Sequence, residues 1–206
     1  MKQTDNLHRF TGKGIFVYPD GNEFEGEFVN GFPNGKGIMR FFNNDRYEGD
    51  WYNGEMEGYG IYKFYDEKKD KYIVKYEGYF HNSTFEGEGK ITYANHSIYY
   101  GFWTAGQRNG MGQLLLNDGT LLSGIWQSDH LSEGVAIMPD GQRYCGGLGS
   151  DYRFHGWGTL FSPDGSWTQG EWSEGEFAKG NAFSANGTCH VFENGKQIDR
   201  KSTRLN

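Results

Sequence analysis

The residues with the clearest potential for chemistry are carboxylates that recur at alternate positions. Glu23, Glu25 and Glu27 form one series, and Glu48 and Asp50 form a second. Paired carboxylates can perform acid–base chemistry on glycosides or hold a hard cation such as Ca²⁺. Here the acids alternate with glycine and aromatic residues, which places them on one side of a β-strand. We therefore interpret them as a solvated strand face, and we expect no bound metal.

The other chemistry-bearing residue types are scattered or sit in the wrong context. No histidine shares a unit with a serine or cysteine nucleophile and an orienting acid. Cys145 and Cys189 stand far apart, with no partner at metal-binding spacing. Several Gly-x-Gly pairs suggest phosphate loops, but they precede strands and lack the Lys-Ser/Thr of a phosphate-binding loop. We expect a chain that is not an enzyme and has no cofactor.

The same glycine pairs reveal the elements that position every other residue. Gly12, Gly35 and Gly58 each open a Gly-x-Gly and stand 23 residues apart, and the pattern returns further along the chain. Self-similarity at a fixed period of this size indicates a repeat array. We count about seven units and a degenerate eighth, with Ser132 replacing the first glycine of the sixth unit.

Each unit has the pattern of one antiparallel hairpin. In the first, residues 14–18 form an apolar run, residues 19–22 have turn chemistry, and residues 23–28 alternate as a return strand. A lone hairpin is marginal in water, so the units must pair edge to edge. The predicted fold is all-β, an elongated single-layer repeat array of antiparallel β-hairpins.

Alternation along the return strands separates a core face from an open face. The predicted core is a ladder of stacked aromatic rings, in which we include Phe24, Phe28, Tyr47, Trp51, Tyr76, Phe80, Tyr99, Trp103, Trp126, Tyr144 and Trp172. A glycine lies between the paired positions of each return strand and gives room for a ring to cross it. These structural glycines are Gly26, Gly49, Gly78, Gly101, Gly124, Gly146 and Gly170.

The opposite face begins acidic, becomes apolar in the middle units, and ends polar. Sheet faces turned to water are normally polar, so the apolar middle predicts a surface for a partner helix or extended peptide. The predicted partner-binding residues are Tyr79, Tyr100, Phe102, Leu115, Leu121 and Ile125. The alternative is that a terminal segment of the chain folds over this patch.

Composition and charge restrict the possible partners. The net charge is −7, and no apolar run has the length of a membrane span or a signal-peptide core. An acidic chain is a poor ligand for nucleic acid and disfavours anionic membranes. We expect a cytoplasmic protein, with cytoskeletal or membrane association left open.

One segment makes the family resemblance specific. Residues 47–54, Tyr-Glu-Gly-Asp-Trp-Tyr-Asn-Gly, followed by Gly-Tyr-Gly at 58–60, strongly resemble the MORN (membrane occupation and recognition nexus) repeat. The resemblance implies a hairpin array used as a protein-interaction scaffold, often as a homodimer. Two alternatives come with it: a regulatory module cut from a larger enzyme, such as one of lipid signalling, and phospholipid-membrane association.

The repeats divide the chain into four predicted segments. Residues 1–11 form a lead-in or cap, residues 12–180 the repeat array, and residues 181–198 a degenerate terminal repeat. The last eight residues, 199–206, depart from all preceding sequence and resemble a translated sequencing adapter. We expect that tail to be non-native, with a downstream domain possible beyond residue 198.

Overall fold

The computed structural model describes residues 10–198, so the tail at 199–206 lies outside the described residues. It divides into two compact units, one up to Gly110 and one from Met111. Each unit is an open single layer of antiparallel hairpins, and no helix occurs among the described residues. This is the predicted all-β repeat array, with eight hairpins and a final short strand.

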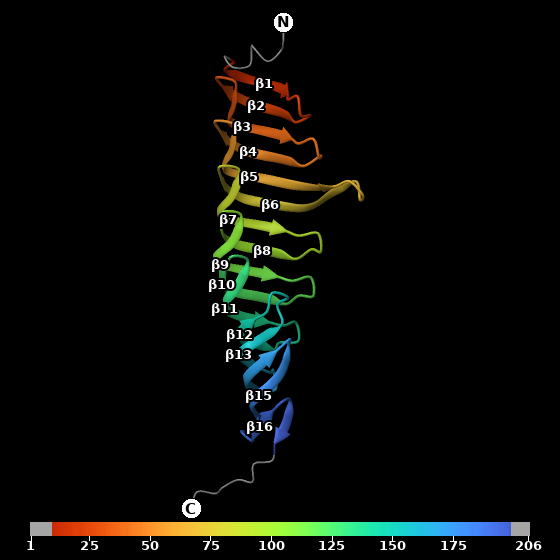
Figure 1. The fold of residues 1–206 in the computed structure, drawn as a ribbon, viewed down its shortest axis with the longest axis vertical. Coiled ribbons are helices and arrows are strands. Elements are labelled where there is room, and N and C mark those ends of the chain that lie inside the picture. Colours follow the sequence, from red (N-terminus) through yellow and green to blue (C-terminus); the bar gives the residue numbers. More distant parts are fainter. Residues whose placement is uncertain (1–9, 199–206) are drawn as a thin grey trace, which may run out of the picture. The chain divides into compact units, whose positions relative to one another are not determined.

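The first unit contains four hairpins and the start of a fifth. Its strands are β1 (Gly12–Val17), β2 (Glu23–Val29), β3 (Phe32–Arg40), β4 (Arg46–Tyr52), β5 (Glu55–Asp66), β6 (Lys71–His81), β7 (Thr84–Thr92), β8 (Ile98–Thr104) and the first part of β9 (Gln107–Leu115). Figure 1 shows the hairpin turns of this unit along one side and the connections between hairpins along the other. The third repeat is longer than the 23-residue period, since its Gly-x-Gly at Gly58 is followed by the next only at Gly87. Its strands β5 and β6 form a hairpin that projects beyond its neighbours (Figure 1).

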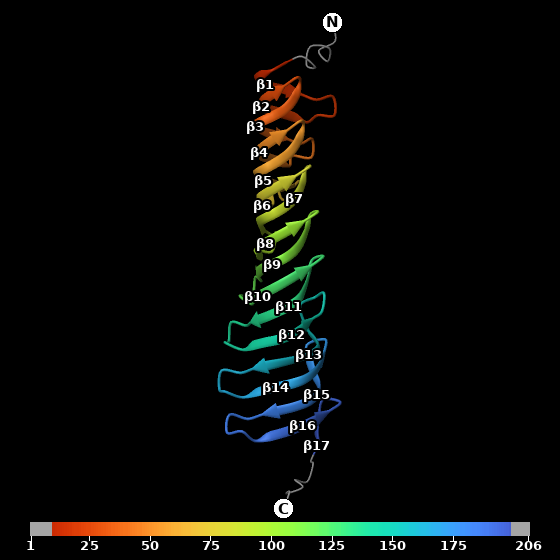
Figure 2. The same cartoon turned by 90° about the vertical axis from the view of Figure 1, so that its left-hand side faces the viewer.

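The second unit continues the same architecture. Its strands after β9 are β10 (Leu121–Gln127), β11 (His130–Ile137), β12 (Arg143–Leu148), β13 (Phe154–Phe161), β14 (Trp167–Ser173), β15 (Glu176–Phe183), β16 (Cys189–Glu193) and β17 (Lys196–Ile198). Figure 2 shows the turns of its hairpins, cyan to blue, along one side of the unit. The degenerate eighth repeat therefore forms a hairpin, β15–β16.

A line of glycines crosses the strands of the first unit. In the β-sheet register Gly14 pairs with Gly26, Gly26 with Gly37, Gly37 with Gly49, Gly49 with Gly60, Gly60 with Gly78, and Gly78 with Gly89. The aromatic residue two positions before each return-strand glycine of this unit covers the line: a Cβ placed on Gly49 would lie 2.4 Å from the Tyr47 hydroxyl. The rings that cross the glycines therefore come from the same strand.

The aromatic core lies on that covered face. All the residues of the predicted ladder are buried, and Tyr47, Tyr76 and Trp126 are fully so. Most rings meet edge to face, as Tyr47 and Trp51 do at 5.1 Å, rather than stacking as the sequence suggested. Parallel stacking occurs where an extra aromatic is present, as between Tyr76 and Phe85 at 3.7 Å. Edge-to-face packing suits aromatic rings because the positive edge meets the negative face.

Each tryptophan of the core also anchors neighbouring strands. The indole N–H of Trp51 donates to the carbonyl of Gly37 at 3.2 Å. The indoles of Trp103, Trp126 and Trp172 make the same bond to the glycine carbonyl 14 residues earlier, at 3.1–3.2 Å. This satisfies a buried donor, which would otherwise cost about 1–3 kcal/mol. Each of these buried tryptophans therefore joins its return strand to the outgoing strand of the same hairpin.

Hairpins that carry the Gly-x-Gly bend at its first glycine. Gly35 and Gly58 have φ values of +85° and +64°, in the left-handed region that favours glycine. The register shifts at the same level, between Gly26 and Phe28 in the β2–β3 pair. The connecting turns then bond to one another, as the Gly54 N–H does to the Pro33 carbonyl at 2.9 Å. The recurring Gly-x-Gly is thus a bend within the outgoing strand, whereas the sequence placed it before the strand.

Candidate interaction surface

The open face is the face of the sheet opposite the aromatic core. In the first unit two rows of side chains run across it, one on each side of the glycine line. The bend row, beside the bends, contains Lys13, Glu27, Lys36, Asp50, Tyr59, Tyr79, Glu88 and Phe102. The centre row contains Ile15, Glu25, Ile38, Glu48, Ile61, Glu77, Lys90 and Tyr100.

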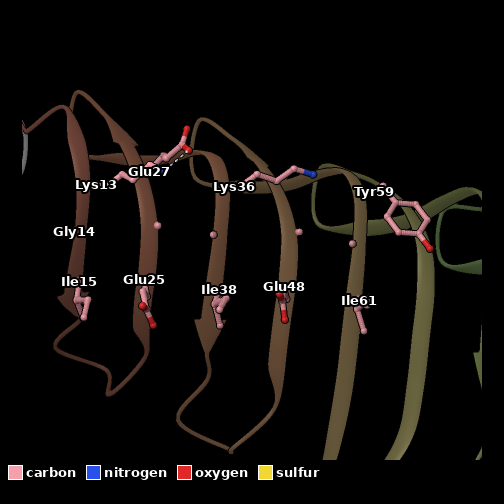
Figure 3. Close-up of a pocket in the computed structure, with 14 residues that line it drawn as sticks. Lys13, Gly14, Ile15, Glu25, Glu27, Lys36, Ile38, Glu48, Tyr59 and Ile61 are labelled. Carbon is pink, nitrogen blue, oxygen red and sulfur yellow. Dashed lines mark ion pairs between the residues drawn. The ribbon is translucent and has the colours of Figure 1, made fainter.

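A hollow of about 760 Å³ lies between these rows over strands β1 to β5. Its floor is the backbone of Gly14, Gly26, Gly37, Gly49 and Gly60. Figure 3 shows Ile15, Glu25, Ile38, Glu48 and Ile61 side by side along one wall, with Lys13, Glu27, Lys36 and Tyr59 along the other. We call this hollow and its continuation toward Tyr79 the open-face groove.

The centre row alternates strictly between isoleucine and glutamate over its first six strands. Ile15 pairs with Glu25, Glu25 with Ile38, and Ile38 with Glu48, and the order continues through Ile61 and Glu77. Outgoing strands supply the isoleucines and return strands supply the glutamates. One apolar and one acidic position therefore recur in each hairpin.

Basic residues neutralise much of the acidic face that the sequence predicted. Arg40 contacts Glu25 at 3.3 Å, Arg46 contacts Glu48 at 2.8 Å, and Lys75 contacts Glu77 at 2.8 Å. In the bend row Lys13 pairs with Glu27, and Lys36 pairs with Asp50. These pairs are solvent-exposed and contribute about 0–1 kcal/mol each. They orient the carboxylates more than they stabilise the fold.

The aromatic end of the groove lies on β5 to β8. Tyr59 and Tyr79 meet edge to face at 5.6 Å and remain 47% and 50% exposed. Tyr100 and Phe102 are 55% and 43% exposed on β8. None of the described residues covers these rings. Four partly exposed aromatic side chains on one open sheet face form an apolar surface of the kind that marks interaction sites.

The structure divides the six predicted partner-binding residues between the two units. Tyr79, Tyr100 and Phe102 belong to the first unit, at the aromatic end of the groove. Leu115, Leu121 and Ile125 belong to the second, where Leu115 and Ile125 are exposed and Leu121 is half-buried. Leu121 pairs across the strands with Ile137. The structure thus brings together the three aromatic residues of the prediction.

Sequence reasoning missed Tyr59 and the isoleucines of the centre row. They lie on the outgoing strands, whereas the prediction of the open face was drawn mainly from the return strands. The signal was present, because Tyr59 stands between Gly58 and Gly60, at the position of Lys13 and Lys36 in earlier repeats. Reading both strands of each hairpin in register would have found the groove.

Two buried tyrosines of the core have shifted pKa values. Burial raises the pKa of Tyr47 and Tyr76, whose hydroxyls donate to the backbone carbonyls of Asp50 and Tyr79. No group of three or more His, Cys, Asp or Glu side chains arranged to hold a metal occurs within residues 10–198. That described part of the chain also contains no helix long and apolar enough to span a membrane.

Comparison with known proteins identifies the repeat. The family model described as the MORN repeat matches residues 8–23, 24–46, 47–68, 76–98 and 99–121, just over half of the chain. The chain belongs to the MORN repeat family. The matched copies contain the whole open-face groove, and the hairpins after residue 121 continue the fold beyond the matched region. No curated protein sequence matches the chain.

One solved structure shares the fold at low identity, and two weaker matches accompany it. The G-box domain of the microcephaly protein CPAP is 15% identical, with a TM-score of 0.51, over 93% of this chain and 100% of that chain. The Drosophila melanogaster SAS-4 TCP domain, solved in complex with a proline-rich motif of Ana2, is 15% identical over 79% of this chain and 85% of its own, with a TM-score of 0.46. The TCP10 domain of Danio rerio CPAP is 16% identical over 90% and 98%, with a TM-score of 0.31.

Proposed function

We propose that this chain is a non-catalytic protein-interaction module that holds a segment of a partner protein in the open-face groove of its first unit. The observation that carries the proposal is that four exposed aromatic side chains lie on the same sheet face as the hollow, beginning at its end. Tyr59 lines the hollow and also contacts Tyr79. Tyrosine and other aromatic residues are enriched at the centres of protein interfaces.

The geometry of the open face favours a narrow ligand. The sheet already uses the backbone hydrogen-bonding groups of its interior strands, so a ligand on this face must bind through side chains. A wall of isoleucine and glutamate on one side and a wall of Lys13, Glu27, Lys36 and Tyr59 on the other suit a single peptide segment better than a flat domain surface. Membership of a repeat family that builds extended sheets is consistent with such a role.

Selection from a random peptide library on the full chain tests the proposal. The variant carries Tyr100→Ser and Phe102→Ser, which remove two exposed aromatics while leaving the buried core intact. Tyr52→Ser is the matched control, because Tyr52 is 66% exposed in the same unit and does not line the hollow. We expect selected peptides to bind the wild type and the control and to lose at least about tenfold in affinity for the double variant.

Two results would contradict the proposal. Selected peptides that bind the double variant as well as the wild type would place the binding surface elsewhere. A selection that yields no peptide, with the chain instead retained on vesicles of anionic phospholipid, would replace peptide binding by membrane association. A circular dichroism spectrum of the double variant matching that of the wild type is the control for folding.

A further inference from the structure

We propose that the segment held in the open-face groove is a polyproline II helix that carries lysine or arginine at every third position. It lies across the strands of the first unit, with successive cations on Glu25, Glu48 and Glu77. This inference rests on the proposed function and adds the conformation and the sequence pattern of the partner.

The first argument is the spacing of the acids. The three glutamates lie on every second strand, because an isoleucine occupies each strand between them. Neighbouring strands are about 4.8 Å apart, so successive glutamates are about 9.6 Å apart. A polyproline II helix advances about 3.1 Å per residue with three residues per turn, so every third side chain returns to the same side after about 9.3 Å.

Other peptide conformations fit this spacing less well. An α-helix returns a side chain to the same side after seven residues, or about 10.5 Å, and accumulates a mismatch of about 1.8 Å from Glu25 to Glu77. A β-strand presents alternate residues about 6.8 Å apart, which matches neither one strand spacing nor two. The polyproline II helix accumulates about 0.6 Å over the same distance.

The second argument is the chemistry of the wall. Ile38 and Ile61 lie between the glutamates and line the hollow. The aliphatic stems of lysine and arginine pack on apolar surface while their charged ends reach a carboxylate. An alternation of isoleucine and glutamate therefore supplies a contact for each part of such a side chain. Isoleucine packs against the aliphatic stem, and glutamate binds the charged end. A purely acidic wall would supply only the charge.

The glutamates retain capacity for a second cation. Each of the three contacts its own basic neighbour through Oε2: Arg40 for Glu25, Arg46 for Glu48, and Lys75 for Glu77. Within residues 10–198, no side-chain hydrogen bond reaches the Oε1 atoms of these three residues. A carboxylate can accept several hydrogen bonds, so a peptide cation can share it. The existing pairs hold each carboxylate in place before the ligand arrives.

The third argument is the aromatic end of the groove. Aromatic side chains are the usual contacts for the proline faces of polyproline II segments. Tyr59 and Tyr79 present partly exposed rings next to the end of the hollow, followed by Tyr100 on β8. A proline-rich segment is already ordered before it binds, and it has few backbone N–H groups that need partners. Both properties reduce the cost of binding to a sheet face that offers side chains alone.

The test measures binding of synthetic peptides to the full chain by fluorescence anisotropy. The probe is four repeats of Pro-Pro-Lys. The spacing control is four repeats of Pro-Pro-Pro-Lys, which has the same charge and the same conformation. A third peptide is helical, with lysines seven residues apart. We expect the three-residue spacing to bind about tenfold more tightly than either control, because the controls cannot place a lysine on all three glutamates.

Substitutions in the chain distinguish binding to the spaced glutamates from a general attraction between opposite charges. Glu48→Gln removes the central carboxylate, and Glu67→Gln removes an exposed carboxylate at the β5–β6 turn, away from the groove. We expect Glu48→Gln to weaken the Pro-Pro-Lys peptide about fivefold, the size of one exposed ion pair, and Glu67→Gln to leave its affinity unchanged.

The outcomes distinguish this inference from the proposed function. Equal affinity for the two proline peptides, tighter binding of the helical peptide, or equal effects of the two glutamine variants would overturn the inference. If library-selected peptides still require Tyr100 and Phe102 while the Pro-Pro-Lys peptide does not bind, the groove is an interaction site for another peptide class. If neither binds, both proposals fail.

Discussion

At the scale of single residues, Gly49 shows how tightly the core covers the glycine line. A Cβ at Gly49 would lie 2.4 Å from the Tyr47 hydroxyl and 2.6 Å from the Cα of Gly60. The second of these neighbours is backbone and cannot move without shifting a strand. We expect Gly49→Ala to reduce the free energy of unfolding by at least about 1–3 kcal/mol, the usual cost of overpacking, as measured by urea denaturation.

Gly14 provides the control, because it lies on the same glycine line, on the outgoing strand of the first hairpin. Its added Cβ would meet the Phe10 ring at 3.4 Å, which is ordinary contact with a side chain that can adjust. Gly14→Ala should therefore change stability by less than about 0.5 kcal/mol. Equal losses for the two variants would mean that glycine flexibility, rather than the ring above it, explains the glycine line.

The pair of His81 and Glu57 gives a prediction on pH. The imidazole Nδ1 lies 2.9 Å from the Glu57 carboxylate, and this contact raises the pKa of His81 above 6.5 and lowers that of Glu57 below 4.5. The raised histidine contributes stability that is lost as pH rises through its folded pKa. The lowered glutamate contributes stability that is lost as pH falls through its folded pKa. The pair therefore stabilises the fold only between these two values.

Titration of His81 by NMR tests this directly. In the wild type the midpoint of the His81 ring signals should lie above 6.5, and in Glu57→Gln it should fall toward that value. An unchanged midpoint in the variant would show that the carboxylate does not set the pKa. Both groups are accessible to solvent, with side chains 62% exposed for His81 and 35% for Glu57, so salt should reduce the difference.

At the scale of elements, the turn between β3 and β4 is fastened to the following hairpin by one buried carboxylate. Asp45 is 8% exposed and accepts hydrogen bonds from the Tyr65 N–H at 2.7 Å and the Tyr62 hydroxyl at 3.1 Å. The carboxylate also raises the pKa of Tyr62, after the larger effect of burial. This contact joins successive repeats outside the strand ladders.

Removing this carboxylate should loosen the junction between the repeats. We expect Asp45→Ala to cost about 1–3 kcal/mol in the free energy of unfolding, because buried donors lose their acceptor. Asp20→Ala is the control, since Asp20 bonds only to Asn22 within its own turn and should cost less than about 1 kcal/mol. Equal losses of stability for the two variants on thermal or urea unfolding would contradict this. They would show that Asp45 stabilises only its own turn and not the junction between repeats.

The hairpins themselves could be predicted from sequence because their signals are local. Turn residues such as Pro19 and Asp20, the alternation after them, and the fixed period are all visible without a structure. The groove could not be predicted in full, because it depends on which residues of different hairpins face one another. Glu25 pairs with Ile38 only because the register of β2 and β3 shifts between Gly26 and Phe28. The sequence of one strand alone does not reveal this shift.

The sixth repeat departs from the repeat sequence, and its hydrogen bonds and strand register differ from those of other repeats. In several other repeats the buried tyrosine hydroxyl donates to the carbonyl three residues later. The Tyr144 hydroxyl is buried without a partner, and the register of β12 shifts between Gly146 and Leu148. Burial raises its pKa to about 12. Ser132, which replaces the repeat glycine, donates its hydroxyl to the Ile125 carbonyl at 3.0 Å, so the β10–β11 pair is kept.

At the scale of the molecule, each hairpin of the array contacts only its neighbours, so damage should spread locally. Trp51 contacts Phe24 and Tyr47 at 5.1 Å and bonds to the carbonyl of Gly37. We expect Trp51→Ala to cost about 3–5 kcal/mol. Hydrogen exchange should accelerate most in β2 to β5 and least in β7 and β8. Uniform acceleration across the first unit would show instead that it unfolds as one cooperative block.

The most direct test of the central claim, that the first unit holds its partner in the open-face groove, is methyl NMR on the isoleucine-labelled chain. The spectrum is recorded during titration with a library-selected peptide. The δ1-methyl groups of Ile38 and Ile61 report on the groove, Ile91 on the buried core, and Ile137 on the second unit. The account predicts shifts at Ile38 and Ile61 that saturate with the peptide, and none at Ile91 or Ile137. Shifts confined to Ile137 and Ile125 would place the partner on the second unit and contradict the account.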